Sequence, residues 1–291
     1  MILIDGKQTA AYFKEKIRSE VDQFLLKGLR PPHLVAVLVG EDPASLAYVK
    51  SKERQSKKVG FKSTLLHYND DISESDLLKI IDQLNQDDAV DGYIVQLPLP
   101  AHIDAQKIIM AVNPQKDVDG FHPLNLGKML ANLPTFLPAT PYGILELIKQ
   151  YNLPTEGKNV LIIGRSLIVG RPLSILLSQK RQGGNATVTV AHSKTRNLKD
   201  LCLQADIIIT ALGKANFLTG DMVREGVVVI DAGINEIAAP EKKRGYKLVG
   251  DVDFESISRK ASYLTPVPGG VGPMTIAMLL QNTLKAYKQR L

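Results

Sequence analysis

The sequence has very little cysteine, the residue that cross-links a chain through disulfides and often binds structural metal ions. It has 291 residues, one cysteine (Cys202) and no tryptophan. A single cysteine excludes an intrachain disulfide, and the apolar neighbours of Cys202 predict a buried, unreactive thiol. No cysteine/histidine cluster has metal-ligand spacing, so we expect no metal site. A hydrophobic core must hold the fold together, and a chain of this length can build one.

Long hydrophobic runs are also missing. The first ten residues hold an apolar run that Asp5 interrupts, which is not the pattern of a signal peptide. No segment approaches the roughly 20 apolar residues of a membrane span. We therefore expect a cytoplasmic protein with no membrane partner.

Negative charge is in slight deficit. Lysine and arginine number 36 against 30 aspartate and glutamate, giving a net charge of +6. This balance favours an anionic small-molecule ligand. A non-catalytic scaffold that binds nucleic acid is the alternative, but the basic residues are spread along the chain and tryptophan is absent. Steep salt dependence of binding would identify such a scaffold.

Short apolar, β-branched segments alternate with segments of helical periodicity. This alternation predicts parallel βαβ units and an α/β fold. A boundary is suggested near 141–158, where a helix is entered through Pro141. We expect two α/β domains with a cleft between them, 1–140 and 141–271, with a final helix at 272–291 joining the first. The expected strands lie at 33–40, 62–68, 90–100, 159–164, 186–192, 205–213 and 226–233, with a further helix at 73–87.

The stretch "NVLIIGRSLIVGRPLSILL" (159–177) reads as a strand, a glycine turn and a helix. Backbone N–H groups at such a helix start can bind a phosphate. Gly164 and Gly170 enclose five residues, with Ser166 where the G-x-G-x-x-G fingerprint has its second glycine. The pattern therefore indicates a Rossmann-type domain or, alternatively, an ordinary glycine turn.

The next strand ends in "HSKTR" (192–196), which contains no carboxylate. NAD enzymes carry an acid here to bind the ribose 2′-OH, whereas a hydroxyl and cations suit a 2′-phosphate. Arg165 could reach the same group. The segment favours NADP over NAD, and a solvated basic turn is the alternative.

A helix is expected after Asp42, which suits the N-cap, and Pro43, which suits the first turn. Its spacing leaves Lys52 as the one lysine on the apolar face, where burial would disfavour the charged amine and let it act as a base. Alternatively, Lys52 snorkels out past the valines. The apolar face holds Ser45, Tyr48, Val49, Lys52, Ser56 and Val59, and the outer face holds Lys50, Arg54, Lys57 and Lys58.

Three further segments suggest a ligand site. Gln96 lies at the carboxyl end of a strand, where open α/β sheets bind ligands. The polar loop "PQKDVDGFHPLNLGK" contains Asp117 and Asp119. The glycine-rich "TPVPGGVGPMT" would let a flat ligand approach the backbone closely.

Eight short motifs follow one another over nearly the whole chain: S-x-x-Y-V-x-x-K at 45–52, "VQLPLP", "KDVDGFHP", "PATPYG", "GRSLIVGRP", "HSKT", "DAGIN" and "TPVPGGVGPMT". Together these motifs resemble the bifunctional methylenetetrahydrofolate dehydrogenase/cyclohydrolase family. The length suits the form without a fused formate-activating synthetase domain.

The resemblance implies roles for particular residues. Tyr48 would stack on the folate, Lys52 would act on the methylene/methenyl carbon, Gln96 would orient Lys52, and Asp119 would bind the pterin ring. These four are the implied catalytic residues. The implied substrate-binding residues are Ser45, Tyr48, Lys52, Gln96, Leu97, Asp119, Pro268, Gly269, Gly270 and Val271. The implied cofactor-binding residues are Gly164, Arg165, Ser166, Ser193, Ile234 and Thr275.

The resemblance also implies an activity and its setting. NADP-dependent oxidation of 5,10-methylenetetrahydrofolate would be followed by hydrolysis of 5,10-methenyltetrahydrofolate to 10-formyltetrahydrofolate, in one-carbon metabolism and purine biosynthesis. The folate could be polyglutamylated. A homodimer is implied, for which "GVVVIDAG" or "ATVTV" could supply the interface. A dehydrogenase without cyclohydrolase activity is the alternative, and an assay of methenyl hydrolysis without NADP would decide.

Overall fold

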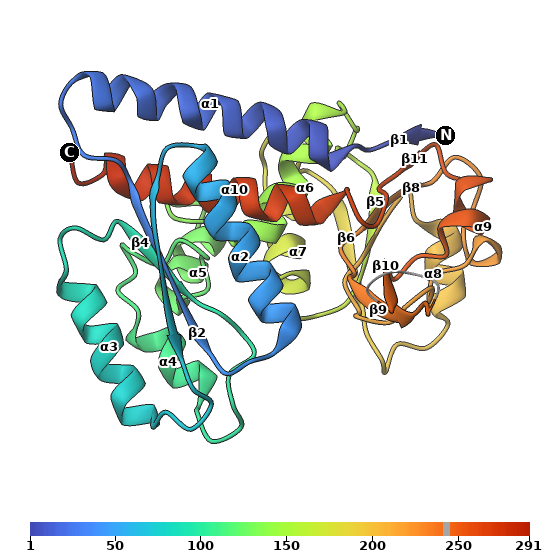
Figure 1. The fold of residues 1–291 in the computed structure, drawn as a ribbon. Coiled ribbons are helices and arrows are strands. Elements are labelled where there is room, and N and C mark those ends of the chain that lie inside the picture. The colour runs from blue at the N-terminus through green and yellow to red at the C-terminus, as the bar shows by residue number, and fades with distance from the viewer. Residues whose placement is uncertain (241–244) are drawn as a thin grey trace. The chain divides into compact units, whose positions relative to one another are not determined.

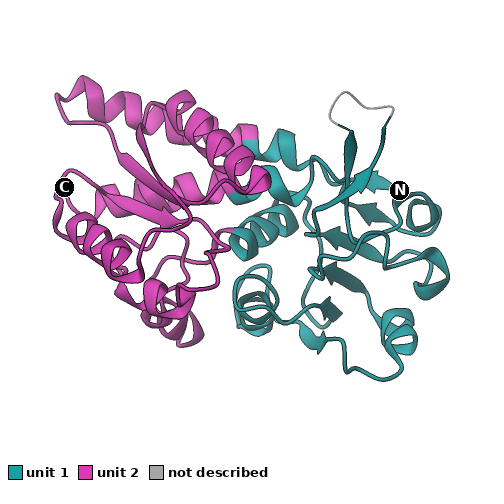
Figure 2. Cartoon of the chain, turned by 60° about the horizontal axis from the view of Figure 1, so that its bottom comes forward, with its two compact units in different colours: residues 1–10, 140–275 teal, residues 11–139, 276–291 magenta. Residues whose placement is uncertain are grey.

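The structure is a computed structural model that describes residues 1–240 and 245–291. The chain divides into two compact units, which Figure 2 distinguishes by colour. Unit 1 comprises Met1–Ala10 and Thr140–Thr275, and unit 2 comprises Ala11–Ala139 and Ile276–Leu291. The first ten residues thus group with the unit that was expected to begin at 141. The cause is β1 (Ile2–Leu3), which pairs in parallel with β11 (Tyr263–Leu264).

Unit 2 is built on a parallel sheet in the order β3-β2-β4. The crossovers from β2 and from β3 run in opposite directions along the sheet, so right-handed connections place α2 and α3 on opposite faces, as Figure 1 shows. Apolar side chains of α3 and α4 pack on alternate residues of β2. The elements are β2 (His33–Val39), α2 (Pro43–Lys58), β3 (Lys62–Tyr68), α3 (Glu74–Gln86), β4 (Gly92–Val95), α4 (Ala105–Ala111) and α5 (Pro123–Leu130).

The strand predicted over 90–100 is shorter in the structure, where β4 ends at Val95. Gln96 still donates its backbone N–H to the Val37 carbonyl at 2.8 Å. Beyond it, Pro98 and Pro100 have no N–H to donate to a ladder, so pairing stops. The break leaves the Gln96 and Leu97 side chains at the carboxyl end of β4.

Unit 1 contains a six-stranded sheet, β1-β11-β8-β7-β5-β6, in which each neighbouring pair is parallel. The strands from β5 onward lie in the spatial order β6-β5-β7-β8-β11. The first strand of this series, β5, thus lies between the second and the third. This is a doubly wound arrangement with its switch point between β5 and β7. The strands are β5 (Asn159–Ile163), β6 (Thr187–Ala191), β7 (Ile207–Thr210) and β8 (Val228–Asp231), and the helices are α6 (Ala139–Gln150), α7 (Gly170–Ser178), α8 (Leu198–Gln204), α9 (Phe254–Ser258) and the 3₁₀ turn η1 (Gly220–Met222).

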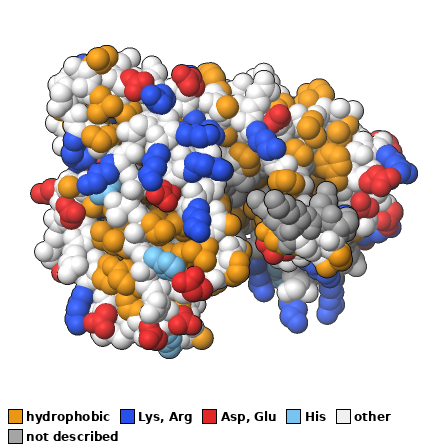
Figure 3. Space-filling view, in the orientation of Figure 1, with side chains coloured by type: hydrophobic (Ala, Val, Ile, Leu, Met, Phe, Trp, Pro, Cys, Tyr) orange, Lys and Arg blue, Asp and Glu red, His pale blue; other side chains and the backbone are white. Residues whose placement is uncertain are grey.

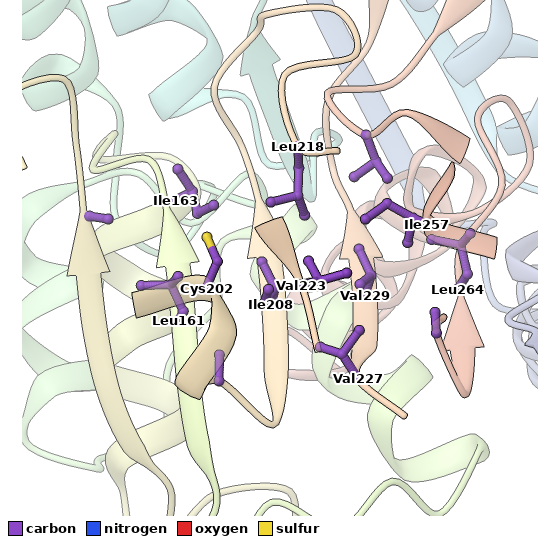
Figure 4. Close-up of a cluster of buried hydrophobic side chains, with 14 residues drawn as sticks. Leu161, Ile163, Cys202, Ile208, Leu218, Val223, Val227, Val229, Ile257 and Leu264 are labelled. Carbon is purple, nitrogen blue, oxygen red and sulfur yellow. The ribbon is translucent and has the colours of Figure 1, made fainter. Parts of the chain in front are cut away.

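The core of unit 1 joins the sheet to α8, as Figure 4 shows. Leu161, Ile208 and Val229 come from three neighbouring strands and pack together with Cys202. Cys202 is fully buried, and burial raises the pKa of its thiol to about 11. The prediction of a buried thiol is confirmed, and a thiol with this pKa stays protonated and unreactive at neutral pH.

Two short features of unit 1 escaped prediction. Strands β1 and β11 have two residues each, too few for a periodic signal, and form because they extend an existing sheet. The antiparallel pair β9 (Asn235–Ala238) and β10 (Tyr246–Val249) is the other. Its half-exposed strands lack a long apolar run.

The last helix, α10 (Val271–Lys288), passes from unit 1 into unit 2. Within unit 2, Asn282 Nδ2 donates to the carbonyls of Val118 and Leu137 at 2.8 and 2.9 Å. The Tyr287 hydroxyl donates to the Arg30 carbonyl at 2.7 Å. These bonds fasten the end of the chain to the unit that contains Asp119.

The two segments considered for a dimer interface differ in the structure. "GVVVIDAG" contains β8, which lies inside the sheet between β11 and β7 and is fully buried, so it cannot present an interface. "ATVTV" contains β6, an edge strand with alternately exposed residues.

None of the helices within residues 1–240 and 245–291 has both the length and the apolar character that a membrane span needs.

Candidate active site

Helix α2 presents the face that its spacing predicts. The Asp42 carboxylate accepts a 2.7 Å hydrogen bond from the Ser45 N–H, and Pro43 occupies the first turn. The cations of the outer face are exposed, and Figure 3 shows lysine and arginine side chains gathered over this part of the molecule. The buried residues of the helix are Ser45, Val49, Lys52 and Ser56.

Lys52 is 5% exposed, so the snorkelling alternative is wrong. Its Nζ donates to Gln96 Oε1 at 3.2 Å. The same nitrogen lies 4.4 Å from the centre of the half-buried Tyr48 ring. The amine is therefore held at a fixed place by one hydrogen bond and one aromatic face.

Gln96 is itself oriented by the backbone. Its Nε2 donates to the Leu97 carbonyl at 2.7 Å, which leaves Oε1 facing Lys52. An amide oxygen can accept from either a neutral or a protonated amine, so Gln96 fixes the position of Lys52 without adding a charge.

The two acids of the polar loop have different surroundings. Asp117 is 5% exposed, and its carboxylate accepts from three backbone N–H groups of residues 120–122 and from Asn125 Nδ2. Asp119 is half-buried, and its carboxylate forms no hydrogen bond within the described part of the chain. Asp117 therefore shapes the loop, whereas the Asp119 carboxylate takes no part in holding it.

Burial governs the electrostatics of this group. It lowers the pKa of Lys52, an effect that the negative charge of Asp119 opposes. It raises the pKa of Asp119, against the pull of Lys52. It also raises the pKa of the Tyr48 hydroxyl, which stays protonated. The amine of Lys52 is thus closer to neutrality than an ordinary lysine, as a proton acceptor near pH 7 requires.

The other candidate residues lie in unit 1, along the carboxyl edge of its parallel sheet. Gly164 has φ +131°, and a Cβ there would lie 2.3 Å from the Ala211 carbonyl oxygen. A Cβ on Gly170 would lie 2.0 Å from the Gly164 oxygen. Both positions require glycine, and they bring the turn close to the switch point where doubly wound sheets bind ligands. Each candidate follows the end of a strand: Gly164, Arg165 and Ser166 follow β5, Ser193 follows β6, Ile234 follows β8, and residues 268–271 follow β11.

The turn after β6 lies beside the turn after β5. Ile163 pairs with Ala191, and the Gly164 N–H donates to the Ala191 carbonyl at 2.9 Å. Arg165 follows Gly164 directly, Ser193 follows Ala191 after one residue, and both are exposed. A hydroxyl and a guanidinium are therefore carried by two neighbouring turns at the carboxyl edge of the sheet.

A pocket of about 150 Å³ joins Ile234 to the glycine-rich segment 268–271. Lys7 also lines it and donates its backbone N–H to the Gly269 carbonyl at 3.0 Å. Sequence reasoning missed Lys7, because only the pairing of β1 with β11 brings it here. Thr275 lies in α10, with its hydroxyl 3.0 Å from that of Thr140.

Two family models together match most of the chain. Residues 4–119 match the family model "Tetrahydrofolate dehydrogenase/cyclohydrolase, catalytic domain". Residues 138–291 match "Tetrahydrofolate dehydrogenase/cyclohydrolase, NAD(P)-binding domain". The first range contains the Lys52 group, and the second contains the glycine turn.

Individual relatives cover the whole chain. The bifunctional protein FolD of Flavobacterium psychrophilum is 55% identical over 100% of this chain and 99% of its own. The crystal structure of the bifunctional enzyme FolD of Campylobacter jejuni is 49% identical, with a TM-score of 0.93 and full coverage of both chains. That of the Trypanosoma brucei dehydrogenase-cyclohydrolase, complexed with NADP cofactor and inhibitor, is 34% identical, covers 99% of this chain and 98% of its own, and has a TM-score of 0.94. The chain belongs to the tetrahydrofolate dehydrogenase/cyclohydrolase family.

Proposed function

We propose that the protein oxidises 5,10-methylenetetrahydrofolate with NADP⁺ and hydrolyses the resulting 5,10-methenyltetrahydrofolate to 10-formyltetrahydrofolate. The observation that carries the hydrolytic half is the buried Lys52 amine, held by Gln96 beside Tyr48. The family unites both activities, which favours this function over that of a dehydrogenase alone.

Unit 2 is the proposed folate-binding unit. Tyr48 offers a ring face for the flat folate, and the Asp119 carboxylate is available to accept N–H bonds from a pterin edge. Ser45, Leu97 and residues 268–271 are the proposed remaining substrate contacts. For Ser45 and Leu97 the support is the burial and position of α2 and β4 together with the family match. Residues 268–271 belong to unit 1, and their proposed role rests on the glycine-rich motif alone.

Hydrolysis requires water to add to the methenyl carbon, the bond from that carbon to N5 to break, and protons to move. Lys52 is the proposed proton carrier: its neutral amine takes a proton from the attacking water and returns it to the departing N5, and the second proton of the water leaves to solvent as the formyl C=O forms. The cationic methenyl group would itself favour a neutral amine nearby, since like charges repel.

The residues of unit 1 fit a dinucleotide. Glycine at 164 and 170 lets the turn after β5 pack tightly, because a Cβ at either position would clash with the Ala211 or the Gly164 carbonyl oxygen. No side chain of the described residues caps the start of α7, so its N–H groups can face an anion. When bound, NADP⁺ accepts the hydride, and the protein supplies position. Gly164, Ser166, Ile234 and Thr275 are proposed cofactor contacts, and Arg165 with Ser193 is the proposed 2′-phosphate site.

Two assays on the purified protein test this function. Reduction of NADP⁺ by methylenetetrahydrofolate reports the dehydrogenase, and loss of methenyltetrahydrofolate without NADP reports the cyclohydrolase. We expect both. Dehydrogenase activity with hydrolysis no faster than the uncatalysed rate would identify a monofunctional enzyme and overturn the proposal.

Replacing Arg165 with alanine should remove most of the preference for NADP over NAD. A charge-assisted bond to the 2′-phosphate is worth about 1.5–3 kcal/mol, so the preference should be roughly tenfold or more in the wild type. The measurement is kcat/KM with each cofactor. Arg259→Ala, an exposed arginine at the end of α9, is the control. Equal kcat/KM values in the wild type would contradict the assignment.

We further propose a cytoplasmic homodimer that acts on folate, polyglutamylated or not, in one-carbon metabolism and purine biosynthesis. The edge strand β6 supports the dimer, since an edge presents unpaired N–H and C=O groups to a second copy.

A further inference from the structure

Two buried acids of unit 1 interlock at the carboxyl edge of the sheet. Asp231 ends β8 and Asp251 follows β10, and they are 3% and 0% exposed. Asp231 Oδ1 accepts from the Asp251 N–H at 3.1 Å and from the Thr210 hydroxyl at 2.9 Å. Its other oxygen accepts from the Val252 N–H at 3.0 Å. Asp231 therefore fixes the backbone that carries Asp251.

Glycines make this interlock possible. A Cβ on Gly250 would lie 1.8 Å from Asp231 Oδ2, and one on Gly233 would lie 2.2 Å from Asp251 Cγ. Each acid thus occupies the space beside the glycine that neighbours the other. The sequences "DAG" and "GD" form one unit of packing rather than two separate turns.

The carboxylate of Asp251 is directed at the loop that follows β7. It accepts hydrogen bonds from three consecutive backbone N–H groups, those of Leu212, Gly213 and Lys214, at 2.6, 3.2 and 2.8 Å. It also accepts from Asn235 Nδ2 at 2.9 Å. One buried group therefore fixes the loop after β7 and the residue next to Ile234.

This loop adjoins the proposed dinucleotide turn. Ala211, the residue before it, has its carbonyl oxygen 2.3 Å from where a Cβ on Gly164 would lie. A shift of the loop would therefore press on or release the Gly164 turn. On the other side, Ile234 lines the pocket with residues 268–271.

We propose that Asp251 is a positioning residue for the dinucleotide: it holds the loop 212–214 and Asn235 so that the turn at Gly164 and the side chain of Ile234 keep their places. The inference rests on the proposed function, because it takes NADP as the ligand of this edge. Asp251 itself touches no reacting atom; it acts through the loop and through Asn235.

The test is Asp251→Asn, which keeps the shape but turns an N–H₂ group toward donors that had a carboxylate. The dissociation constant for NADP⁺, measured by titration, and its KM in the dehydrogenase assay should rise about tenfold to hundredfold, since buried donors lose their acceptor. The dehydrogenase kcat should largely return at saturating NADP⁺. Methenyl hydrolysis without NADP should stay within about twofold, since the proposed proton carrier lies in unit 2.

Asp206→Asn is the matched control. This acid also accepts a strand N–H, from Asn159 at 2.8 Å, but at the amino ends of β5 and β7. It should leave the NADP⁺ dissociation constant unchanged. An equal rise in both variants would mean general loosening of unit 1 and would overturn the proposal, as would an unchanged constant in Asp251→Asn.

Asn235→Ala decides the matter if Asp251→Asn does not fold. It removes one of the four donors at a half-buried position, and the dissociation constant should rise by several-fold with hydrolysis preserved. An unchanged constant would overturn the proposal. Failure of the proposed function looks different: the wild type would then lack NADP⁺ reduction or methenyl hydrolysis.

Discussion

Lys52→Met lowers the rate of methenyl hydrolysis by about 10²–10⁴-fold, the usual size of a general acid–base contribution. The variant keeps the length and apolar stem of a side chain that is 5% exposed, and it removes only the amine. Folding should survive, because no new polar group is buried. Dehydrogenase activity should fall much less, because the hydride passes to NADP⁺ and the loss there reflects only a misplaced folate.

Two further variants separate the amine from its charge and its helix. Lys52→Arg should not restore hydrolysis, since a guanidinium stays protonated. Lys50→Met, on the exposed face of the same helix, should be nearly silent. Equal losses of hydrolysis in the two methionine variants would show that the loss comes from a general change in α2. The buried amine of Lys52 would then have no special role in the chemistry.

Asp119→Ala should weaken both activities together, by about tenfold to hundredfold in kcat/KM. The carboxylate is half-buried and forms no hydrogen bond within the described part of the chain. Its removal should therefore weaken ligand binding rather than the fold. Hydrogen bonds to a charged group are worth about 1.5–3 kcal/mol, which corresponds to that range. Both reactions need the same ring held, so both should suffer.

Asp82→Ala, an exposed acid of α3, is the control for this variant and should change neither activity. Both assays are run on the same preparation of each variant. If either activity of Asp119→Ala stayed near the wild-type level, Asp119 would not be the shared anchor.

The pH profile of hydrolysis should carry the signature of Lys52. At pH values below the pKa of Lys52 in the folded protein, its amine is protonated and cannot accept a proton. The enzymatic rate should therefore rise with pH and level off above that pKa. Burial places this midpoint below the ordinary lysine value of 10.5. After subtraction of the uncatalysed reaction, the rise should be absent in Lys52→Met. The same rise in both proteins would assign it to another group.

The sequence predicted which lysine faces inward but not what becomes of it. Helical spacing placed Lys52 on the same side as Val49, and the structure buries both. Four methylene groups let a lysine leave such a face, so periodicity alone kept both outcomes open. What decides is Gln96, 44 residues away, whose position depends on the pairing of β4 with β2.

Parallel α/β architecture was predictable because buried strands and helices alternate, but the strand order was not. Pairing of β1 with β11 brings Lys7 to the pocket beside Ile234, and a two-residue strand gives no signal in the sequence. Asp251 was missed as well. An acid next to a glycine after an apolar strand is usual turn chemistry, and only the distances to the loop after β7 show its use.

The most direct test of the central claim, that the buried amine of Lys52 performs the hydrolysis, is the ratio of cyclohydrolase to dehydrogenase activity in wild type and Lys52→Met, each from one preparation at saturating substrates. The ratio cancels errors in the concentration of folded enzyme. We predict that it falls by about hundredfold or more in the variant. A ratio equal to that of the wild type would contradict the account, because the amine would then only help to hold the folate.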